Sequence, residues 1–499
     1  MIPVRKCNGI LIVPVLLLIA CNSIHFNPFV SKEVKQGYKL AKVYCSSCHQ
    51  FPEPDLLDKS TWALYVLPRM GGLLGFRQLE TGGYIEGGKE RIKLDQWKQI
   101  VRYYTSQAPE EPLRGKKNKI RTALKHFSIN IPSFTIQRPA TTLVKIDSGK
   151  QRIYFGDGLT GQLYALSNDY RLTDSFEVNP GISGLHIGGR NMMALSMGVL
   201  HPSDEKKGKL AVIDTGKTRM HNLLDSLQRP VHALHVDLTN DGREDIIVAE
   251  FGNQTGMLSW FENIPEDRYA KHILRAQPGA VRSQVNDFNK DGRPDIIALM
   301  AQGDEGLFIY YNLGNGNFRE ERILQFPPSY GSNYFELADV NHDGFADIIA
   351  TNGDNGDYPP ILKAYHGIRI YLNDGHNQFR QEVFLPVNGA GKAIAKDFDG
   401  DGDIDLASIA YFADYDHYPE EGFIYWENTG RLSFEPSSFE KVSMGRWLTM
   451  DAGDIDGDGD LDIILGNTNF SLGYVPEQLK KKWDRYAPSV VILVNNLYR

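Results

Sequence analysis

Five short acidic loops recur at a nearly constant spacing in this 499-residue chain. They span residues 237–245, 287–295, 339–347, 397–405 and 454–462, and each stands between two apolar runs. Successive copies lie about 50 to 58 residues apart, a period in the range of β-propeller blades. The repeat therefore predicts a ring of small β-sheets with one acidic loop on each of at least five blades.

Each loop offers side-chain oxygens at its first, third, fifth and ninth positions and a glycine at its sixth. Hard oxygen ligands around a sharp glycine turn suit Ca²⁺. An EF-hand is not expected, because an apolar strand follows each loop. A metal-free Asp-Gly turn stays open for the loop with a threonine at position three. The candidate calcium ligands are Asp237, Thr239, Asp241, Asp245, Asp287, Asn289, Asp291, Asp295, Asp339, Asn341, Asp343, Asp347, Asp397, Asp399, Asp401, Asp405, Asp454, Asp456, Asp458 and Asp462.

These loops resemble the FG-GAP or VCBS repeats of integrin α-like propellers. The resemblance implies a calcium loop between the first two strands of a blade, and short runs such as residues 257–263 then supply the third strand. Two weaker copies, at 143–166 and 182–213, carry the strand pattern without a complete acidic loop. Seven blades are therefore expected. They begin near Thr141, Gly181, Val231, Ala280, Gly331, Gly391 and Gly445.

A second candidate binding motif lies near the N-terminus, where Cys45, Cys48 and His49 form a C-x-x-C-H sequence. Two thiols at this spacing can bond to the vinyl groups of a haem while the adjacent histidine ligates its iron. The competing interpretations are a thioredoxin-like redox pair and half of a zinc site. No strand-rich βαβ pattern surrounds the motif and no second cysteine pair exists, so covalent haem c is favoured.

Apolar residues at helical spacing predict one helix before this motif, around residues 34–44, and another at 94–104 that ends near Ala108. Residues 31–110 resemble a small all-α, monohaem class I-like cytochrome c domain. Met70 is the only Met or His between residues 50 and 125, which makes it the candidate sixth iron ligand. It is expected in a turn that Pro68 and two glycines permit, and a gap-filling core methionine is the alternative.

The first residues resemble a bacterial lipoprotein signal. A cationic start, an apolar run at 10–19 and a small residue stand before Cys21. The resemblance implies removal of residues 1–20, a lipid on the Cys21 sulfur and a tether at 21–30. An uncleaved membrane helix is the alternative, although the apolar run is short for one. The expected location is the bacterial cell envelope, with the chain lipid-anchored in the periplasm or at the cell surface.

The expected fold is thus multidomain: a haem domain (31–110), a charged linker (111–125) and an all-β propeller (126–499). The net charge of −8 argues against nucleic acid as a partner. On the propeller, the face opposite the acidic loops is the candidate binding face, because its connections lengthen at 351–365, 411–421 and 467–489.

Polar residues near the start of several innermost strands are expected to surround the propeller axis. Several are cations, which on an acidic protein would attract an anion or a sugar acid. The alternative is a wet channel without a ligand. This candidate ligand ring comprises His232, Arg282, Tyr334, Lys392 and Arg446.

The leading functional hypothesis is envelope electron transfer by a membrane-anchored c-type cytochrome whose propeller docks a redox partner protein, a small molecule or a carbohydrate. A second hypothesis makes the propeller a dehydrogenase that oxidises a carbohydrate or alcohol and passes electrons to the haem. A third is an adhesion or binding module. No flavin or nicotinamide fingerprint is present, a quinone cofactor stays open, and no catalytic residue can be named.

Overall fold

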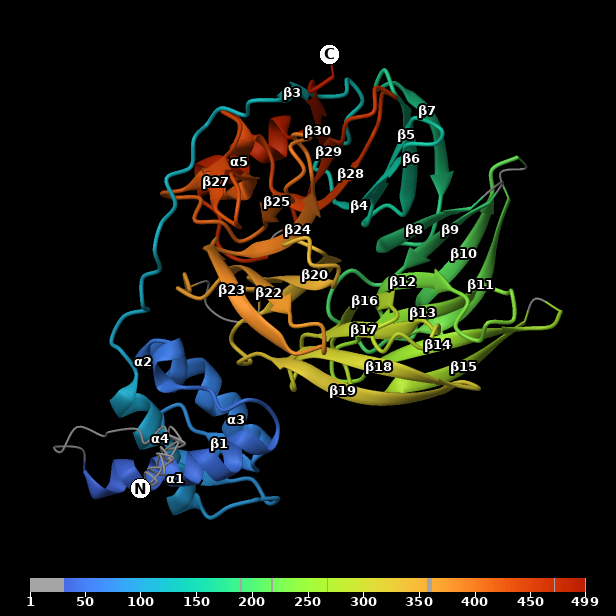
Figure 1. Ribbon diagram of the computed structural model, residues 1–499. Coiled ribbons are helices and arrows are strands. Elements are labelled where there is room, and N and C mark those ends of the chain that lie inside the picture. The colour runs from blue at the N-terminus through green and yellow to red at the C-terminus, as the bar shows by residue number, and fades with distance from the viewer. Residues whose placement is uncertain are drawn as a thin grey trace, which may run out of the picture.

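The computed structural model describes residues 31–498 apart from 189–190, 217–218, 267, 357–360 and 471. A helical N-terminal domain lies against one side of a ring of seven four-stranded sheets (Figure 1). The expected signal peptide, tether and lipidated Cys21 fall outside the described residues. Within the described residues, no helix combines the length and apolar character needed to cross a membrane.

Two helices cross at the centre of the N-terminal domain, as the sequence predicts. They are α1 (Lys32–Tyr44) and α4 (Leu94–Gln107). Helix α1 begins where the Ser31 hydroxyl accepts a hydrogen bond from the backbone N–H of Val34. At the crossing, a Cβ on Gly37 would lie 2.2 Å from the carbonyl oxygen of Gln99, so only glycine allows this approach.

Between these helices the chain forms a 3₁₀ turn at Pro54–Leu56 and then a continuous helical segment. The segment consists of α2 (Lys59–Thr61), a π-helical turn (Trp62–Val66) and α3 (Leu67–Leu73). The prediction that Met70 lies in a turn is wrong, since it lies within α3. The π-helical turn directly before Pro68 gives the proline ring room that a regular helix denies it.

The N-terminal domain is not entirely helical, which corrects the all-α expectation. A two-stranded hairpin of β1 (Phe76–Gln78) and β2 (Tyr84–Glu86) follows α3. Trp97 of α4 packs between Phe76 and Tyr84, with ring centroids 5.9 and 5.5 Å away. The hairpin therefore completes the domain core beside α4.

Seven blades form the ring, which confirms the predicted number, and their first strands begin within two residues of the predicted starts. Blade 1 has β4 (Thr141–Asp147), β5 (Arg152–Asp157), β6 (Gln162–Ser167) and β7 (Leu172–Glu177); blade 2 has β8 (Ile182–Gly188), β9 (Asn191–Ser196), β10 (Gly208–Asp214) and β11 (Arg219–Leu227); blade 3 has β12 (Pro230–Val236), β13 (Asp245–Glu250), β14 (Met257–Ile264) and β15 (Arg268–Arg275). Blade 4 has β16 (Ala280–Asn286), β17 (Asp295–Met300), β18 (Gly306–Gly314) and β19 (Asn317–Gln325); blade 5 has β20 (Ser332–Ala338), β21 (Asp347–Asn352), β22 (Gly367–Asn373) and β23 (Phe379–Pro386); blade 6 has β24 (Ala390–Lys396), β25 (Asp405–Ala410), β26 (Phe423–Asn428) and β27 (Phe434–Ser437).

Blade 7 closes the ring with a strand from the other end of the propeller sequence. Its first three strands are β28 (Trp447–Gly453), β29 (Asp462–Asn467) and β30 (Val490–Asn495). The fourth is β3 (Phe127–Asn130), which pairs antiparallel with β30. Sequence reasoning missed this strand because it is short and lies far from its partner in the chain.

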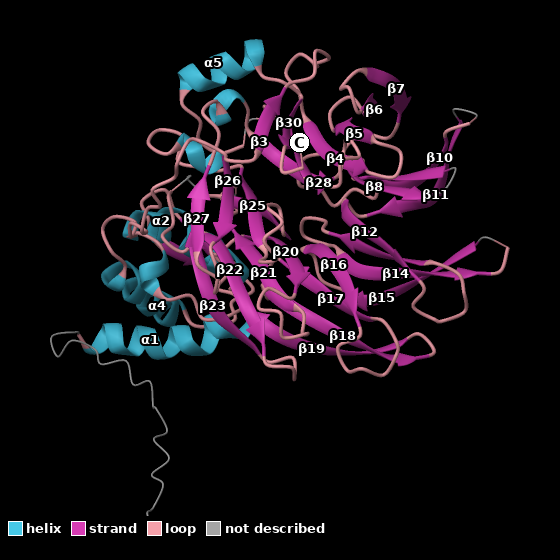
Figure 2. Cartoon of the chain, turned by 45° about the horizontal axis from the view of Figure 1, so that its top comes forward, coloured by secondary structure: helices cyan, strands magenta, loops and turns pink. Residues whose placement is uncertain are grey.

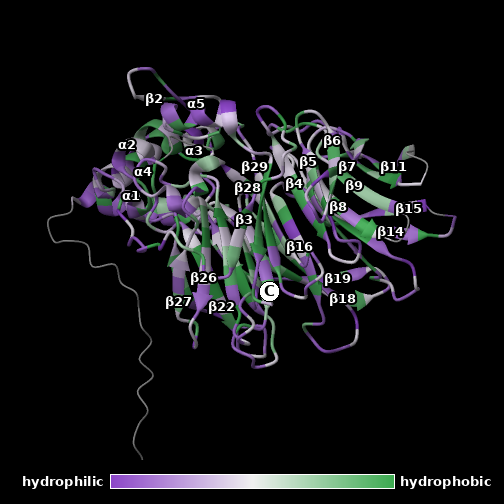
Figure 3. Cartoon of the chain, turned by 90° about the horizontal axis from the view of Figure 1, so that it is seen from above, coloured by the Kyte–Doolittle hydropathy of each residue, from purple (hydrophilic) through white to green (hydrophobic). Residues whose placement is uncertain are grey.

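The position of a strand within its blade explains its pattern of apolar residues. Each second strand that follows an acidic loop is buried along its whole length, as in β13, because neighbouring blades cover both of its faces. Such strands read as continuous apolar runs. Outer strands such as β15 alternate between exposed and half-buried residues. In Figure 3 the strands carry green, hydrophobic segments and the turns between them are largely purple.

The segment at 111–125, predicted to be a solvated linker, is largely exposed and lies along blades 5 and 6. Ile120 and Leu124 pack against the cores of the ring. The Asn118 side-chain amide donates a hydrogen bond of 2.6 Å to the carbonyl of Pro386. These contacts hold the helices on one side of the ring of strands (Figure 2).

Three further short helices lie in the connections of blades 6 and 7. They are the 3₁₀ turns Pro419–Gly422 and Val442–Met444 and the helix α5 (Glu477–Tyr486). Helix α5 occupies the connection between β29 and β30, which the sequence presents as a long loop. Trp483 of α5 is buried and donates a hydrogen bond to the carbonyl of Ser443, so the helix is fixed to the ring.

Candidate functional site

The C-x-x-C-H motif lies in the turn directly after α1. Cys45 begins a 3₁₀ turn and is 8% exposed, whereas Cys48, which caps that turn, is exposed to solvent. The two thiols are not joined in a disulfide. Burial raises the pKa of Cys45 to about 11, the opposite of the lowered pKa that a thioredoxin-like pair requires.

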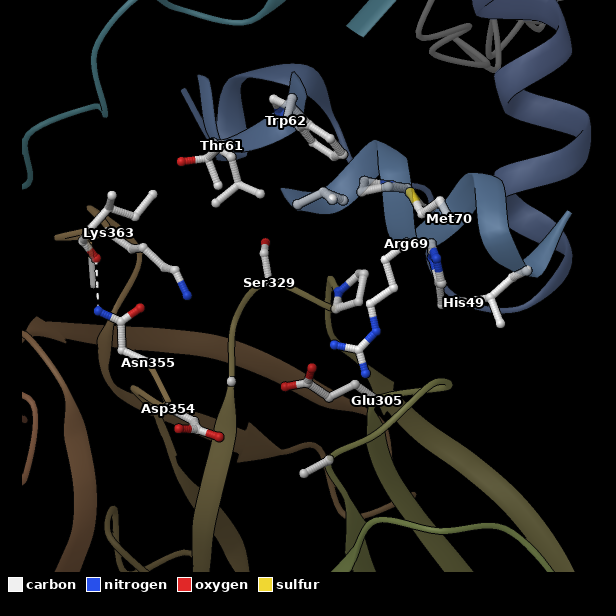
Figure 4. Close-up of a pocket in the computed structure, with 18 residues that line it drawn as sticks. His49, Thr61, Trp62, Arg69, Met70, Glu305, Ser329, Asp354, Asn355 and Lys363 are labelled. Atoms are coloured by element: carbon white, nitrogen blue, oxygen red, sulfur yellow. Dashed lines mark hydrogen bonds between the residues drawn. The ribbon is translucent and has the colours of Figure 1, made fainter. Parts of the chain in front are cut away.

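His49 and Met70, the two candidate iron ligands, line one cavity of about 240 Å³ (Figure 4). The Nδ1 atom of His49 lies 2.8 Å from the carbonyl oxygen of Gln50. A proton on Nδ1, donated to this carbonyl, leaves Nε2 free to ligate a metal. The apolar part of the cavity wall is formed by Pro52, Leu57, Trp62, Val66, Leu73 and Ile361.

These residues fit a covalently bound haem. An imidazole with a free Nε2 and a thioether line a cavity with apolar walls, and two thiols with two residues between them lie in the turn directly before that imidazole. Together they are the donor set of a Met/His haem. Helix α3 can approach closely here because Gly71 has no side chain. A Cβ at Gly71 would lie 3.0 Å from the Trp97 ring. His49 and Met70 would hold the iron, and Cys45 and Cys48 would hold the porphyrin.

The propeller supplies the opposite wall of this cavity, a contribution that sequence reasoning missed. Glu305 comes from the connection between β17 and β18 of blade 4, and Asp354, Asn355 and Lys363 come from the long connection of blade 5. Figure 4 shows Arg69 of α3 extending across the cavity toward Glu305. Both connections lie on the face opposite the acidic loops, which the sequence marked as the candidate binding face.

Direct contacts hold the two domains together at this wall. The Tyr365 hydroxyl donates a hydrogen bond of 3.0 Å to the carbonyl of Leu56. Ile361 packs against the core of the helical domain.

Glu305 is buried and accepts a hydrogen bond of 2.6 Å from the backbone N–H of Ser332. Burial raises the pKa of Glu305 to about 7.

The five acidic loops share one hydrogen-bonding scheme, in which the ninth-position aspartate is a structural anchor. In blade 3, Asp245 accepts hydrogen bonds from the backbone N–H groups of Leu238 and Asn263, at 2.9 and 2.8 Å. The same pair of contacts recurs in each of the other four loops. Burial is the main cause that raises the pKa of Asp405 and of Asp462, each to about 6.

The five acidic loops differ in how many carboxylates they bring together and in whether an arginine pairs with one of them. Three carboxylates come within 4.8 Å of one another at Asp397, Asp399 and Asp405 in blade 6, and the corresponding residues of blade 7 do the same. In blade 3 the guanidinium of Arg243 pairs with Asp241, and blade 4 repeats this pair. The loops of blades 6 and 7 are therefore the stronger candidates for Ca²⁺.

Four members of the candidate ligand ring come together at the axis. The Arg282 guanidinium and the Lys392 ammonium lie over the Tyr334 ring, at 4.4 and 5.1 Å from its centroid. The backbone N–H of Ser283 donates to Nδ1 of His232 at 3.4 Å. Burial lowers the pKa of Lys392 to about 8.

The channel also contains a carboxylate that sequence reasoning missed. Glu336 is half-buried near Arg282 and Lys392, and it accepts a hydrogen bond from the backbone N–H of Ala395. Its position two residues after Tyr334 was the available signal, because alternate residues of a strand face the same side. The carboxylate offsets part of the positive charge of the ring.

Arg446 does not join this ring, which corrects its assignment. Its guanidinium lies 3.6 Å from the ring centroid of Tyr411, and Nε donates to the Tyr411 carbonyl. It precedes β28 and is fully buried in the contact between blades 6 and 7. Among the lengthened connections, the first supplies Asp354, Asn355, Ile361 and Lys363 to the cavity wall, 411–421 contacts the linker through Lys117, and 467–489 contains α5.

Comparisons with known proteins agree with this architecture. A family model described as FG-GAP-like repeat matches residues 237–298, 287–350 and 397–465. Integrin alpha-PS5 of Drosophila melanogaster is 24% identical over 213 residues, which cover 40% of this chain and 18% of that protein. Integrin alpha-PS3 of the same organism is 27% identical over 158 residues, covering 27% and 14%.

The T-cell immunomodulatory protein homolog of Plasmodium falciparum is 33% identical over 137 residues, covering 24% of this chain and 18% of that protein. The match thus spans less than a fifth of each of these relatives. Among solved structures, a chain from the S. cerevisiae complex of Dbp5 with Nup159 and Gle1 has a TM-score of 0.44 at 11% identity, over 77% of this chain and 99% of that one. The Cps50 (Swd1) propeller domain of a Myceliophthora species has a TM-score of 0.43 at 11% identity, over 73% and 99%. The matched residues 237–350 and 397–465 are therefore FG-GAP-like repeats within the seven-bladed propeller, and in this part the chain is similar to integrin α-chains.

Proposed function

We propose that this chain is a lipid-anchored c-type cytochrome of the bacterial cell envelope, whose propeller is the binding domain for a redox partner or ligand. The observation that carries the proposal is the convergence of His49 and Met70 on one cavity directly after the Cys45–Cys48 turn. A haem bound there supplies one-electron chemistry, and a Met/His pair raises its potential.

The residues of the chain itself give this site its properties. The Gln50 carbonyl orients the His49 ring. Trp62 and Leu57 exclude water from one side of the cavity, while blade 4 and blade 5 cover the other. A partner bound to the propeller face near Glu305 and Asp354 would therefore lie next to the redox centre. The propeller has FG-GAP-like repeats and is similar to integrin α-chains, which supports its role as a binding module.

The haem proposal is tested by expressing the full chain with a c-type cytochrome maturation system. Mass spectrometry of the peptide that contains Cys45 and Cys48 should show one added haem. The double variant Cys45→Ala/Cys48→Ala should lack both the added mass and the c-type absorption spectrum. An unmodified wild-type peptide would overturn the proposal. The lipid anchor is tested separately by the release of Cys21→Ser from the membrane fraction.

Oxidation of a carbohydrate or alcohol is a second candidate function, and one feature favours it. Glu305, Asp354, Asn355 and Lys363 bring polar groups to the same cavity as the candidate iron ligands, an arrangement typical of small-molecule sites. Anaerobic screening of sugars and alcohols distinguishes the two functions. Reduction of the haem by one compound in wild type, and its loss in Asn355→Ala, would favour the dehydrogenase.

A further inference from the structure

Two imidazoles and a carboxylate from three elements meet at the mouth of the axial channel. His186 comes from β8 of blade 2, His235 from β12 of blade 3, and Glu244 from the acidic loop just before β13. One ligand atom of each lies within 4.8 Å of the other two. The two imidazole rings stack with centroids 4.1 Å apart. This cluster lies apart from both the haem cavity and the candidate ligand ring.

One nitrogen in the cluster is buried and has no hydrogen-bond partner. Nε2 of His235 makes no hydrogen bond to any part of the chain that the structure describes. A buried polar atom without a partner costs about 1 to 3 kcal/mol, so such atoms are rare in folded proteins. In the tautomer protonated at Nδ1, this nitrogen has an unused lone pair in reach of a second imidazole and a carboxylate.

Comparison of the five acidic repeats shows that His235 and Glu244 occur only in blade 3. His235 stands two residues before the first aspartate of its acidic loop, and Glu244 stands at the eighth position of the same loop. The four other loops have only apolar or small residues at both positions. These are Val285, Leu337, Ala395 and Ala452 at the first position, and Pro294, Ala346, Ile404 and Leu461 at the second.

We propose that His186, His235 and Glu244 bind one divalent transition-metal ion of the zinc class. Imidazole nitrogens prefer such ions over Ca²⁺, which takes oxygen ligands. Three protein ligands leave a fourth position of a tetrahedral site open. That position faces a cavity of about 540 Å³, lined by both histidines and by Asp147, where an oxygen ligand or water can reach the metal. The proposal does not depend on the haem.

To bind the ion, the stacked His186 and His235 rings have to turn about their side-chain torsions so that one nitrogen of each points at a common centre. Glu244 is exposed and sits on a loop, so its carboxylate can move toward the imidazoles. The neighbouring loop carboxylate Asp241 already pairs with Arg243 and does not compete for the ion. The ion would join blade 2 to blade 3 at a point where the acidic loop of blade 3 collects less charge than those of blades 6 and 7.

The test uses the full-length protein with its calcium loops saturated. Zinc chloride is titrated into this protein by isothermal titration calorimetry in millimolar CaCl₂, and metal analysis after gel filtration gives the stoichiometry. We expect one zinc ion per chain and a rise in the unfolding temperature. Glu244→Gln, His186→Ala and His235→Ala should each weaken zinc binding at least about tenfold.

A matched control is present in the same blade. The ring of His272 lies 2.9 Å from the Glu262 carboxylate on the outer strands of blade 3, so His272→Ala removes a histidine beside a glutamate far from the channel. It should bind zinc as wild type does. Glu244→Gln changes an exposed loop residue and should fold normally, as near-ultraviolet circular dichroism will check. Absence of zinc binding to wild type, or unchanged affinity in folded Glu244→Gln and His235→Ala, would overturn the proposal.

Discussion

Arg243 pairs with Asp241 inside the acidic loop of blade 3, where the loops of blades 6 and 7 carry a further aspartate instead. The guanidinium supplies positive charge that the loops of blades 6 and 7 must obtain from a bound cation. The five repeats are therefore unequal in electrostatic terms, although their sequences follow one pattern.

Calcium should stabilise the ring mainly through blades 6 and 7. We expect Asp401→Asn, at the fifth position of the blade 6 loop, to reduce the calcium-dependent gain in unfolding free energy by about 1 to 2 kcal/mol, which corresponds to roughly a tenfold loss of affinity in one loop. Asp241→Asn, the matched change in blade 3, should reduce it by less than half as much. Urea unfolding with calcium and with chelator measures both. Equal losses would contradict the ranking of the loops.

Glu305 should make the stability of the protein depend on pH. Its folded-state pKa of about 7 lies above the ordinary glutamate value of 4.5, so its contribution is fully present below about pH 4.5 and is lost as the pH rises through 7. The slope is at most about 1.4 kcal/mol per pH unit. We expect Glu305→Gln to flatten the pH dependence between 5 and 8 and to be more stable than wild type at pH 8. The exposed-site control Glu440→Gln should keep the wild-type slope.

If the proposed haem is bound, Met70 should set its redox potential. Met70→Ala removes a thioether ligand that favours the reduced iron, so the midpoint potential should fall by about 0.1 V or more. Spectroelectrochemical titration measures the change. Met197→Leu, a substitution in the propeller core, should leave the potential unchanged. If Met70→Ala also leaves it unchanged, Met70 is a core residue and not an iron ligand.

The contact between Tyr365 and Leu56 should contribute to domain docking. Tyr365→Phe removes one hydrogen bond to a backbone carbonyl, which should weaken docking by about 1 kcal/mol. Weaker docking should expose the segment that joins the domains, so the rate of proteolytic cleavage between residues 109 and 118 should rise in this variant. Tyr486→Phe, at a side chain that is 78% exposed, is the control and should be cut at the wild-type rate.

Phe127 should be essential for a closed ring. Its ring packs edge-on against Phe398 and Tyr425, with centroids 6.2 and 5.6 Å away, while its backbone pairs with Asn495. Phe127→Ala should lower the unfolding free energy by about 2 to 3 kcal/mol. Ser128→Ala, on the same strand, should change it by less than about 0.5 kcal/mol. Similar effects of the two substitutions would show that strand pairing, and not this side chain, closes blade 7.

The blades were predictable because their signals are local. An acidic turn followed by a continuous apolar run identifies the second strand of a blade, and its burial between neighbouring blades explains why the run does not alternate. The two helices that cross at Gly37 were predictable from their spacing for the same reason. The candidate haem residues could be named from the sequence because three of them lie within five consecutive residues, and their role stays a prediction.

Features that depend on distant contacts were not predictable from one sequence. Met70 lies in a helix because a π-helical turn accommodates Pro68. Arg446 faces Tyr411 and not the axis, because the chain enters blade 7 through a different turn. The wall that Glu305 and Lys363 add to the cavity beside His49 and Met70 exists only once the domains have docked.

The pairing of β3 with β30 also fixes the order in which a newly made chain can assemble. The ribosome releases β3 before any blade and releases β30 after six blades are complete, so closure has to wait until translation has passed residue 495. Until then blade 7 presents an unpaired edge that could join another chain. Because the helical domain immediately precedes β3, the step that protects this edge also delivers that domain to its place beside blades 4 and 5.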